Sequence, residues 1–188
     1  MGSKLVFLAA ILFSINSFAQ NDSDHGYFFI EKSQKYLNLG KLDKAKRFIA
    51  KARKSDFRGG NPEATAKSRI NLIEAQILIR KKLYSEALTL LDTTHGASFG
   101  VNCAERDSLK IVTLFLLYGK QKVKDSFKNL HVEISTNESQ FDAQNCAFIG
   151  ELNYVFCFFS DFFVPEDEKT KISFEELAKN MAFYKLLQ

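Results

Sequence analysis

Tryptophan is absent from the sequence, and proline occurs only twice. So few prolines, together with only nine glycines, exclude a collagen-like, linker-rich or disordered chain. The histidines, His25, His95 and His131, are far apart and lack ligand partners at helical spacing, so the sequence predicts no metal site. It also contains no glycine-rich phosphate loop and no serine in a nucleophile elbow. These absences favour a protein with no cofactor and no catalytic activity.

The chain starts with the pattern of a signal peptide. Lys4 provides a positive charge, an apolar stretch runs from Leu5 to Ile15, and the small residues Ser17 and Ala19 precede the expected cleavage site. The stretch is too short to span a bilayer comfortably, although an uncleaved anchor is the alternative. The pattern is typical of Gram-negative exported proteins. We therefore expect a periplasmic or secreted protein with no stable membrane insertion after cleavage, and one domain over residues 20–188.

Apolar spacing predicts four helices in the first half of the chain. Gly40 interrupts the pattern between the first two, and the Asn61–Pro62 pair marks the start of the third. The expected helices are residues 24–38, 42–57, 62–81 and 84–94. The second pair aligns with the first at a step of 42 residues, which places Ala87 on Ala45. Three apolar pairs agree with this step, namely Leu42 with Tyr84, Phe48 with Leu90 and Ile49 with Leu91.

The segments "GKLDKA" before "FIAKA", and "KKLYSEA" before "LLDTT", resemble the tetratricopeptide repeat family, whose unit is a helix–turn–helix. Ser33 and Ala75 match the small residue of the family's first helix. The resemblance covers about residues 26–59 and 68–101. A weaker helix pair over residues 108–130 has Ser126 in place of the alanine. The resemblance implies an all-α, right-handed α-solenoid of about four helix pairs.

The family binds extended peptides or partner helices in a concave groove lined by first helices. Spacing of i, i+7 and i+11 puts each of two sets of residues on one helix face, independently of the resemblance. The groove residues that we expect are Tyr27, Gln34, Asn38, Arg69, Gln76 and Arg80, continued by Phe115 and Tyr118 in the third pair. Exposed amide and guanidinium groups suit hydrogen bonds to a peptide. A polar surface without a partner is the alternative.

The last third of the sequence is less regular. We expect a loop near residues 133–144, a phenylalanine-rich helix from about residue 146 to 163, and a solvated loop at residues 165–171. Ser173 and Glu176 form a capping-box pattern before a final helix over residues 174–187. The phenylalanine-rich helix is apolar nearly all round, which predicts burial between its neighbours.

Three cysteines in an exported protein allow one disulfide and one remaining thiol, or three free thiols. Cys103 and Cys146 precede first helices of consecutive pairs, whose starts are neighbours in space, so these two are the expected disulfide. Cys157 lies among aromatic residues and is expected to be a packing residue.

Charge is unevenly distributed along the chain. Residues 21–82 contain 15 Lys/Arg and 7 Asp/Glu, whereas residues 83–188 contain 10 and 15. This favours an acidic partner, an anionic envelope surface, or head-to-tail association into a homo-oligomer, unless the lysines only form a solvated face. Nucleic acid is not expected after export.

The leading hypothesis is a non-enzymatic scaffold or adaptor that binds a protein or peptide. One alternative is a helical enzyme or inhibitor that uses Cys157 or the carboxylates of residues 165–168. Another is a stand-alone relative of the repeat-containing sensor region of a signalling protein.

Overall fold

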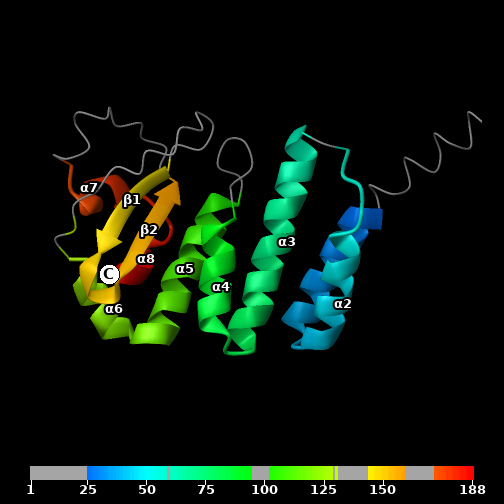
Figure 1. Cartoon of the computed structure of the whole chain (residues 1–188), viewed down its shortest axis with the longest axis horizontal. Helices are drawn as coiled ribbons and strands as arrows, with labels where there is room; N and C mark the ends of the chain where they lie inside the picture. Colours follow the sequence, from blue (N-terminus) through cyan, green and yellow to red (C-terminus); the bar gives the residue numbers. More distant parts are fainter. Residues whose placement is uncertain (1–24, 59, 95–101, 129, 131–143, 160–171) are drawn as a thin grey trace, which may run out of the picture. The chain divides into compact units, whose positions relative to one another are not determined.

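The computed structural model describes residues 25–58, 60–94, 102–128, 130, 144–159 and 172–188 (Figure 1). Among these residues the fold is predominantly helical, with one small two-stranded sheet. The chain divides into two compact units, the N-terminal unit Met1–Ile73 and the C-terminal unit Glu74–Gln188. The expectation of one domain over residues 20–188 stays a prediction. The division falls within helix α3 (Gly60–Arg80).

The N-terminal unit contains a first helix over residues 25–38, helix α2 (Leu42–Ala52) and the N-terminal part of α3. The expected helices are present, but α2 ends at Ala52 instead of residue 57. Its apolar spacing puts Ala45, Ile49 and Ala52 on one buried face. Phe57, beyond the helix end, is buried as well, and a Cβ on Gly26 would lie 2.6 Å from its Cε1 atom. Glycine at residue 26 therefore allows the chain after α2 to pack closely against the first helix.

Small residues let the first helix and α2 approach each other. Ser33 and Ala45 are both fully buried, and the Ser33 hydroxyl donates to the Ala45 carbonyl oxygen at 2.9 Å. A larger side chain at either residue would push the helix axes apart. In the C-terminal unit Ala75 and Ala87 are also fully buried. All four small residues of the repeat alignment are therefore in the interior of the fold.

The turn after the first helix recurs after α3 in hydrogen-bond detail. Gly40 and Lys82 are equivalent at the 42-residue step, and both have a positive φ, 69° for Gly40 and 62° for Lys82. Glycine adopts this conformation without steric cost, whereas lysine does not. In each turn one amide bonds back five residues and the preceding amide bonds back three. These bonds are Lys41 N to Tyr36 O (2.9 Å), Gly40 N to Leu37 O (2.9 Å), Leu83 N to Leu78 O (3.0 Å) and Lys82 N to Ile79 O (3.0 Å).

The third helix pair has a different turn. Gly119 alone, with a φ of 89°, separates α5 from α6. The sequence alignment was weak at this pair, and the turn geometry accordingly does not repeat there.

The C-terminal unit combines helices with a β-hairpin. Helix α4 lies along α5, and the two strands form an antiparallel pair. The elements are α4 (Tyr84–Asp92), α5 (Cys103–Tyr118), α6 (Lys120–Ser126), β1 (Gln144–Ile149), the 3₁₀ turn η2 (Gly150–Leu152), β2 (Tyr154–Phe159), α7 (Phe174–Ala178) and α8 (Tyr184–Leu187).

The phenylalanine-rich helix expected to begin near residue 146 is wrong, because residues 144–159 fold as the β1–β2 hairpin (Figure 1). Aromatic and β-branched residues favour strands, and an apolar run without helical periodicity fits a buried strand as well as a buried helix. Along β2, Val155 is half exposed, whereas Phe156 and Phe158 are fully buried. Asn153 provides the left-handed residue of the turn, with a φ of 48°.

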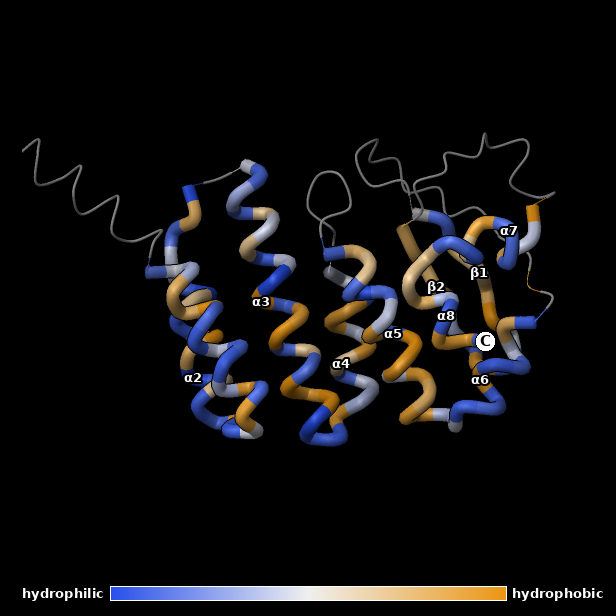
Figure 2. The backbone as a smooth tube through the Cα atoms, turned by 180° about the vertical axis from the view of Figure 1, so that it is seen from behind, coloured by the Kyte–Doolittle hydropathy of each residue, from blue (hydrophilic) through white to orange (hydrophobic). Residues whose placement is uncertain are grey.

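The hairpin contributes to an aromatic core in the C-terminal unit. The rings of Phe156, Phe158, Phe174 and Phe183 contact one another with centroids 5.2–6.3 Å apart. Figure 2 shows the corresponding orange segments along β1 and β2. Buried aromatic pairs of this kind add to the free energy of burial. The core thus explains part of the phenylalanine excess in the sequence.

The final helix is shorter than expected. The capping box is confirmed, since Ser173 Oγ accepts from the Glu176 amide and Glu176 accepts from the Ser173 amide. However, α7 ends at Ala178, and α8 begins only at Tyr184, so one continuous helix over residues 174–187 is wrong. The break lets Phe183 enter the aromatic core.

Several expectations lie outside the described residues, namely the signal peptide, most of the loop near residues 133–144 and the loop at residues 165–171. Within the described part of the chain, no helix has the length and apolar character needed to cross a membrane.

Candidate functional site

The groove residues expected in the N-terminal unit are brought together by the structure. Gln34 Nε2 donates to Asn38 Oδ1 at 3.0 Å, and Arg69 Nη2 on α3 donates to Gln34 Oε1 at 3.5 Å. At the other end of the same helix face, the Tyr27 hydroxyl donates to the Pro62 carbonyl oxygen at 3.3 Å. The first helix and α3 therefore present one continuous polar face, which we call the amide–arginine face (Tyr27, Gln34, Asn38 and Arg69).

This face remains accessible to a partner. Tyr27 is 40% exposed, Asn38 is exposed, and Gln34 and Arg69 are half-buried. The internal hydrogen bonds hold the Gln34 and Arg69 side chains in position, which reduces the conformational entropy lost on binding. Arg69 supplies the positive charge of the face, and a guanidinium group can form paired hydrogen bonds with a carboxylate.

In the C-terminal unit the structure supports only part of the expected groove. Gln76, equivalent to Gln34 at the 42-residue step, donates to Glu105 Oε1 on α5 at 2.9 Å. Arg80 is exposed at the last residue of α3. The sequence reasoning did not select Glu105, because the weak third repeat gave no alignment for the start of α5.

Phe115 and Tyr118 lie on other sides of α5 than Glu105, the partner of Gln76. Phe115 is half-buried and packs against the aromatic core, and its expected role as a groove residue stays a prediction. Tyr118 is 39% exposed, and Lys122 Nζ lies 5.8 Å from its ring centroid. A helix advances about 100° per residue, which puts Phe115 about 80° and Tyr118 about 140° around α5 from Glu105.

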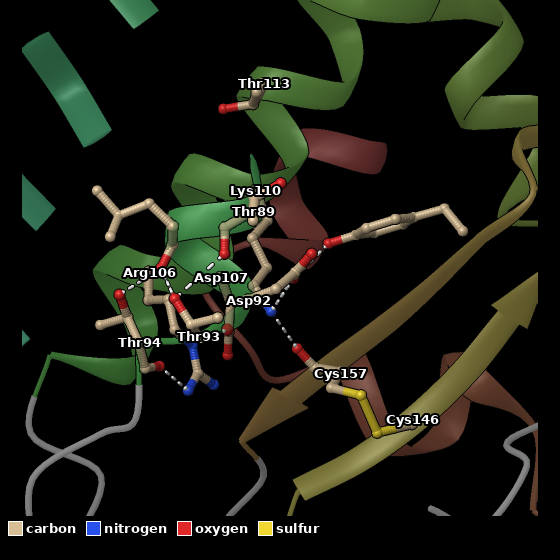
Figure 3. Close-up of polar contacts among 12 residues, drawn as sticks. Thr89, Asp92, Thr93, Thr94, Arg106, Asp107, Lys110, Thr113, Cys146 and Cys157 are labelled. Carbon is tan, nitrogen blue, oxygen red and sulfur yellow. Dashed lines mark hydrogen bonds and ion pairs between the residues drawn. A yellow bond between two sulfur atoms is a disulfide. The ribbon is translucent and has the colours of Figure 1, made fainter. Parts of the chain in front are cut away.

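A buried charged cluster, which the sequence reasoning missed, lies between α4, α5 and the hairpin (Figure 3). Arg106 Nε donates to Asp107 Oδ1 at 2.7 Å, and Arg106 Nη1 donates to the Thr94 carbonyl oxygen at 3.1 Å. The other carboxylate oxygen of Asp107 accepts a hydrogen bond from the backbone amide of Phe159 on β2 at 3.1 Å. The cluster therefore connects the end of α4 to β2 through α5.

Lys110 makes the second half of the cluster. Its Nζ lies 2.8 Å from Asp92 Oδ1 on α4 and donates to the Cys157 carbonyl oxygen on β2 at 3.1 Å (Figure 3). Tyr154 donates its hydroxyl to the same Asp92 oxygen at 2.6 Å. Burial is the main cause that lowers the pKa of Lys110, and the Asp92 carboxylate opposes it. Burial, and then Asp92, raise the pKa of the Tyr154 hydroxyl.

The helical phase of α5 contained a signal for this cluster. Arg106, Asp107 and Lys110 fall on the same stripe as the buried Cys103 and Leu114. Charged residues on an apolar stripe indicate a buried ionic network when they can pair with one another. The Lys110 side chain is 2% exposed, and its ammonium group contacts the Asp92 carboxylate and the Cys157 carbonyl oxygen. Lys110 therefore anchors the hairpin to α4 and α5.

The cysteine pairing is a correction. Cys146 is bonded to Cys157, which lies directly opposite it in the β1–β2 register, so the expected Cys103–Cys146 disulfide is wrong. Cys103 is buried at the first residue of α5 and does not belong to the disulfide. The error follows from the missed hairpin, because a helix over residues 146–163 would have kept Cys146 and Cys157 apart.

The interpretation of Cys157 as a nucleophile is also wrong for this structure. Catalysis by cysteine requires a thiolate, and the Cys157 sulfur is oxidised in the disulfide. The carboxylates at residues 165–168, the other catalytic hypothesis, lie outside the described residues.

One cleft of about 260 Å³ lies in the N-terminal unit, near Arg53, Asp56, Phe57, Lys67 and Asn71. Arg53 Nη2 donates to Asn71 Oδ1 at 3.0 Å, and Lys67 pairs with Glu63. The charged groups at this cleft already bond to neighbouring residues, so the cleft favours no class of ligand. In the described segments, no group of three or more His, Cys, Asp or Glu residues has an arrangement that could hold a metal ion.

Comparisons of the chain with protein-family models, curated proteins and solved structures found no match. The function must therefore be argued from the chain's own residues.

Proposed function

We propose that the protein is a non-catalytic, exported adaptor that binds a protein or peptide partner through the amide–arginine face. The observation that carries this proposal is the Gln34–Asn38–Arg69 network, a preorganised set of hydrogen-bonding groups on two neighbouring helices. Side-chain amides bond to a peptide backbone, and Arg69 favours an acidic side chain or a C-terminal carboxylate.

The repeated turn supports an α-solenoid similar to tetratricopeptide repeat proteins. The turns at Gly40 and Lys82 share their backbone conformation and hydrogen bonds at a 42-residue step. Gln34 and Gln76, which are also equivalent at this step, each bond to a residue of the following first helix. A right-handed solenoid is the arrangement proposed for such a repeat.

Export is supported by two independent features. Residues 1–19 have the charge, apolar stretch and small residues of a signal peptide. The Cys146–Cys157 disulfide fits an oxidising compartment such as the periplasm, because the cytosol keeps thiols reduced. Sequencing the N-terminus of the protein recovered from cells should find Gln20 as its first residue, and Met1 or Gly2 would contradict export with cleavage.

The binding proposal can be tested by crosslinking in cells. A photoreactive amino acid at Asn38, on the amide–arginine face, should capture a defined partner, and the same group at Ala50, an exposed residue of α2, should not. Arg69→Ala should reduce capture at Asn38, whereas Lys185→Ala removes one positive charge from an exposed residue of α8 and should not. Identical capture from Asn38 and Ala50, or capture insensitive to Arg69→Ala, would contradict the proposal.

A further inference from the structure

The N-terminal unit carries a second face that the proposed partner site does not use. Four aromatic rings lie in a row across the first helix and α2. Centroids are 5.7 Å apart for Phe28 and Phe29, 6.2 Å for Phe29 and Phe48, and 5.3 Å for Tyr36 and Phe48. Phe28 is 46% exposed, and the other three rings are half-buried. The row is therefore a contiguous aromatic surface at the outside of the helix pair.

Three lysines lie over these rings. Lys32 Nζ lies 5.1 Å from the centroid of the Phe28 ring, and Lys44 Nζ lies 5.5 Å from that of Tyr36. Lys51 Nζ lies 5.5 Å from the Phe29 centroid and 5.6 Å from the Phe48 centroid. Cation–π attraction holds the ammonium groups against the rings while leaving them hydrated. We call this surface the lysine–aromatic face (Phe28, Phe29, Lys32, Tyr36, Lys44, Phe48 and Lys51). None of its seven residues is acidic.

Helical phase separates this face from the core and from the amide–arginine face. In the first helix, residues 28, 29, 32 and 36 share one side, whereas the buried residues 30, 33 and 37 and the polar residues 27, 34 and 38 occupy two others. The side with residues 28, 29, 32 and 36 is therefore separate from the buried side, so its aromatic rings are not needed to close the core. Figure 2 shows hydrophilic and hydrophobic segments alternating along α2, as expected for an amphipathic helix.

The chemistry of the face favours a lipid surface over a peptide. Its polar groups are three ammonium groups and one phenol, so it offers no side-chain amide to pair with a peptide backbone. Tyrosine rings prefer the headgroup region of a bilayer, and phenylalanines on an interfacial helix enter the boundary between headgroups and acyl chains. Lysines beside them attract anionic lipids. The surrounding sequence adds positive charge, with 15 Lys/Arg against 7 Asp/Glu over residues 21–82.

We propose that the lysine–aromatic face docks the protein onto an anionic lipid bilayer. Phe28, the most exposed ring, enters the headgroup region, and Lys32, Lys44 and Lys51 contact lipid phosphates. The attachment is peripheral and reversible, because it uses side chains of two short helices at a surface. The amide–arginine face lies on a different side of the first helix and stays available to a protein partner.

Vesicle sedimentation with the full chain tests this proposal. Wild-type protein should bind vesicles that contain phosphatidylglycerol and should bind pure phosphatidylcholine vesicles weakly. The triple variant K32Q/K44Q/K51Q should lose about tenfold or more in affinity for the anionic vesicles. The matched triple variant K120Q/K179Q/K185Q, with the same charge change at exposed residues of the C-terminal unit, should bind within about twofold of wild type.

A second pair of variants tests the aromatic part. Phe28→Ala should weaken binding even at high salt, whereas Leu116→Ala, at a residue of similar exposure (47% against 46%), should not. Deleting residues 1–19 should leave the difference between wild type and K32Q/K44Q/K51Q unchanged, which excludes binding by the apolar N-terminus. Circular dichroism should show that every variant is folded.

Three results would overturn the proposal. The first is equal binding of the two triple variants to anionic vesicles. The second is equal binding of wild type to phosphatidylcholine and phosphatidylglycerol vesicles. The third is that the protein binds a single-stranded oligonucleotide or an acidic peptide more tightly than the anionic vesicles, and that this binding depends on Lys32, Lys44 and Lys51.

Discussion

Lys110 and Asp92 form an ion pair that holds α5 to α4, with Nζ and Oδ1 2.8 Å apart and the lysine side chain 2% exposed. Lys110 also bonds to the backbone of β2 through the Cys157 carbonyl oxygen. The ammonium group therefore joins three elements that are distant in sequence. A network of this kind costs desolvation energy and stabilises the fold only while every member keeps its partner.

Replacing Lys110 by methionine should destabilise the protein by about 3 kcal/mol, the lower end of the cost of breaking a buried pair, because Asp92 keeps some solvent. The side-chain exposure of Asp92 is 36%. Urea denaturation measures the change, and Lys185→Met at an exposed residue is the control. In the double variant Lys110→Met/Asp92→Asn the loss should be smaller than in Lys110→Met. Additive losses would show that the two residues do not interact.

Tyr154 should make the protein sensitive to alkaline pH. Its hydroxyl keeps the proton in the folded state because its pKa is raised, whereas in the unfolded chain it loses the proton near the usual pKa of 10.0. A raised folded pKa contributes stability below the unfolded value, and this stability is lost as pH rises above it. Wild-type stability should therefore fall more steeply above pH 10 than that of Tyr154→Phe.

The pH comparison isolates Tyr154 because Lys110 is present in both proteins. Lys110 has the opposite effect on the pH dependence of stability. Because its pKa is lowered in the folded state, the unfolded chain binds this proton more tightly just below pH 10.5, and stability rises with pH there. At neutral pH, Tyr154→Phe should cost about 1.5–3 kcal/mol for the lost hydrogen bond to the charged Asp92 carboxylate. Parallel stability curves for the two proteins between pH 8 and 11 would contradict the assignment.

The disulfide should stabilise the C-terminal unit. Cys146 and Cys157 are separated by 11 residues, and closing a loop of this length in the unfolded chain is worth about 3 kcal/mol. Cys146→Ser/Cys157→Ser should lose about this amount in urea denaturation. Cys103→Ala is the control and should keep the Cys146–Cys157 peptide in a non-reducing digest. A Cys103-containing disulfide in wild type would contradict the structure.

The sequence predicts the helices of the first two pairs well because they combine periodic apolar residues with local turn signals. Gly40, Ala45 and Ala87 each satisfy one local requirement, and their repetition at 42 residues made the alignment visible. The tetratricopeptide resemblance indicated the residues of the amide–arginine face, and helix spacing places Tyr27, Gln34 and Asn38 on one side of the first helix. The contact of Arg69 on α3 with Gln34 depends on tertiary packing.

The hairpin was missed for a physical reason. Residues 146–159 are apolar in nearly every position, so their pattern has neither a helical nor a strand period, and tertiary contacts decide between the two. The missed hairpin then hid the disulfide, the aromatic core and the partners of Lys110 and Asp107, all of which depend on contacts between distant residues. Asn153 in the turn was the available local signal.

Close packing at the repeated alanine should make Ala87 intolerant of a larger side chain. Ala87 is fully buried, as is Ala75 on α3. Ala87→Leu should destabilise the protein by about 1–3 kcal/mol, the usual cost of overpacking. Ala50→Leu adds the same atoms to an exposed residue of α2 and should change the free energy of unfolding by less than about 0.5 kcal/mol. Equal effects of the two substitutions would contradict the role of small residues in the helix pairs.

Reciprocal substitutions at Gly40 and Lys82 test whether the two turns are equivalent. Lys82 has a φ of 62°, where a side chain is strained, whereas Gly40 at 69° is not. Lys82→Gly should therefore stabilise the protein by about 1 kcal/mol, and Gly40→Ala should destabilise it by about the same amount or more. No atom lies within 4 Å of a Cβ built on Gly40, so this loss would come from backbone strain and not from a steric clash. Thermal and urea denaturation measure both changes. If Lys82→Gly were destabilising, the residue would not hold the left-handed conformation, and the two turns would not be the same structure.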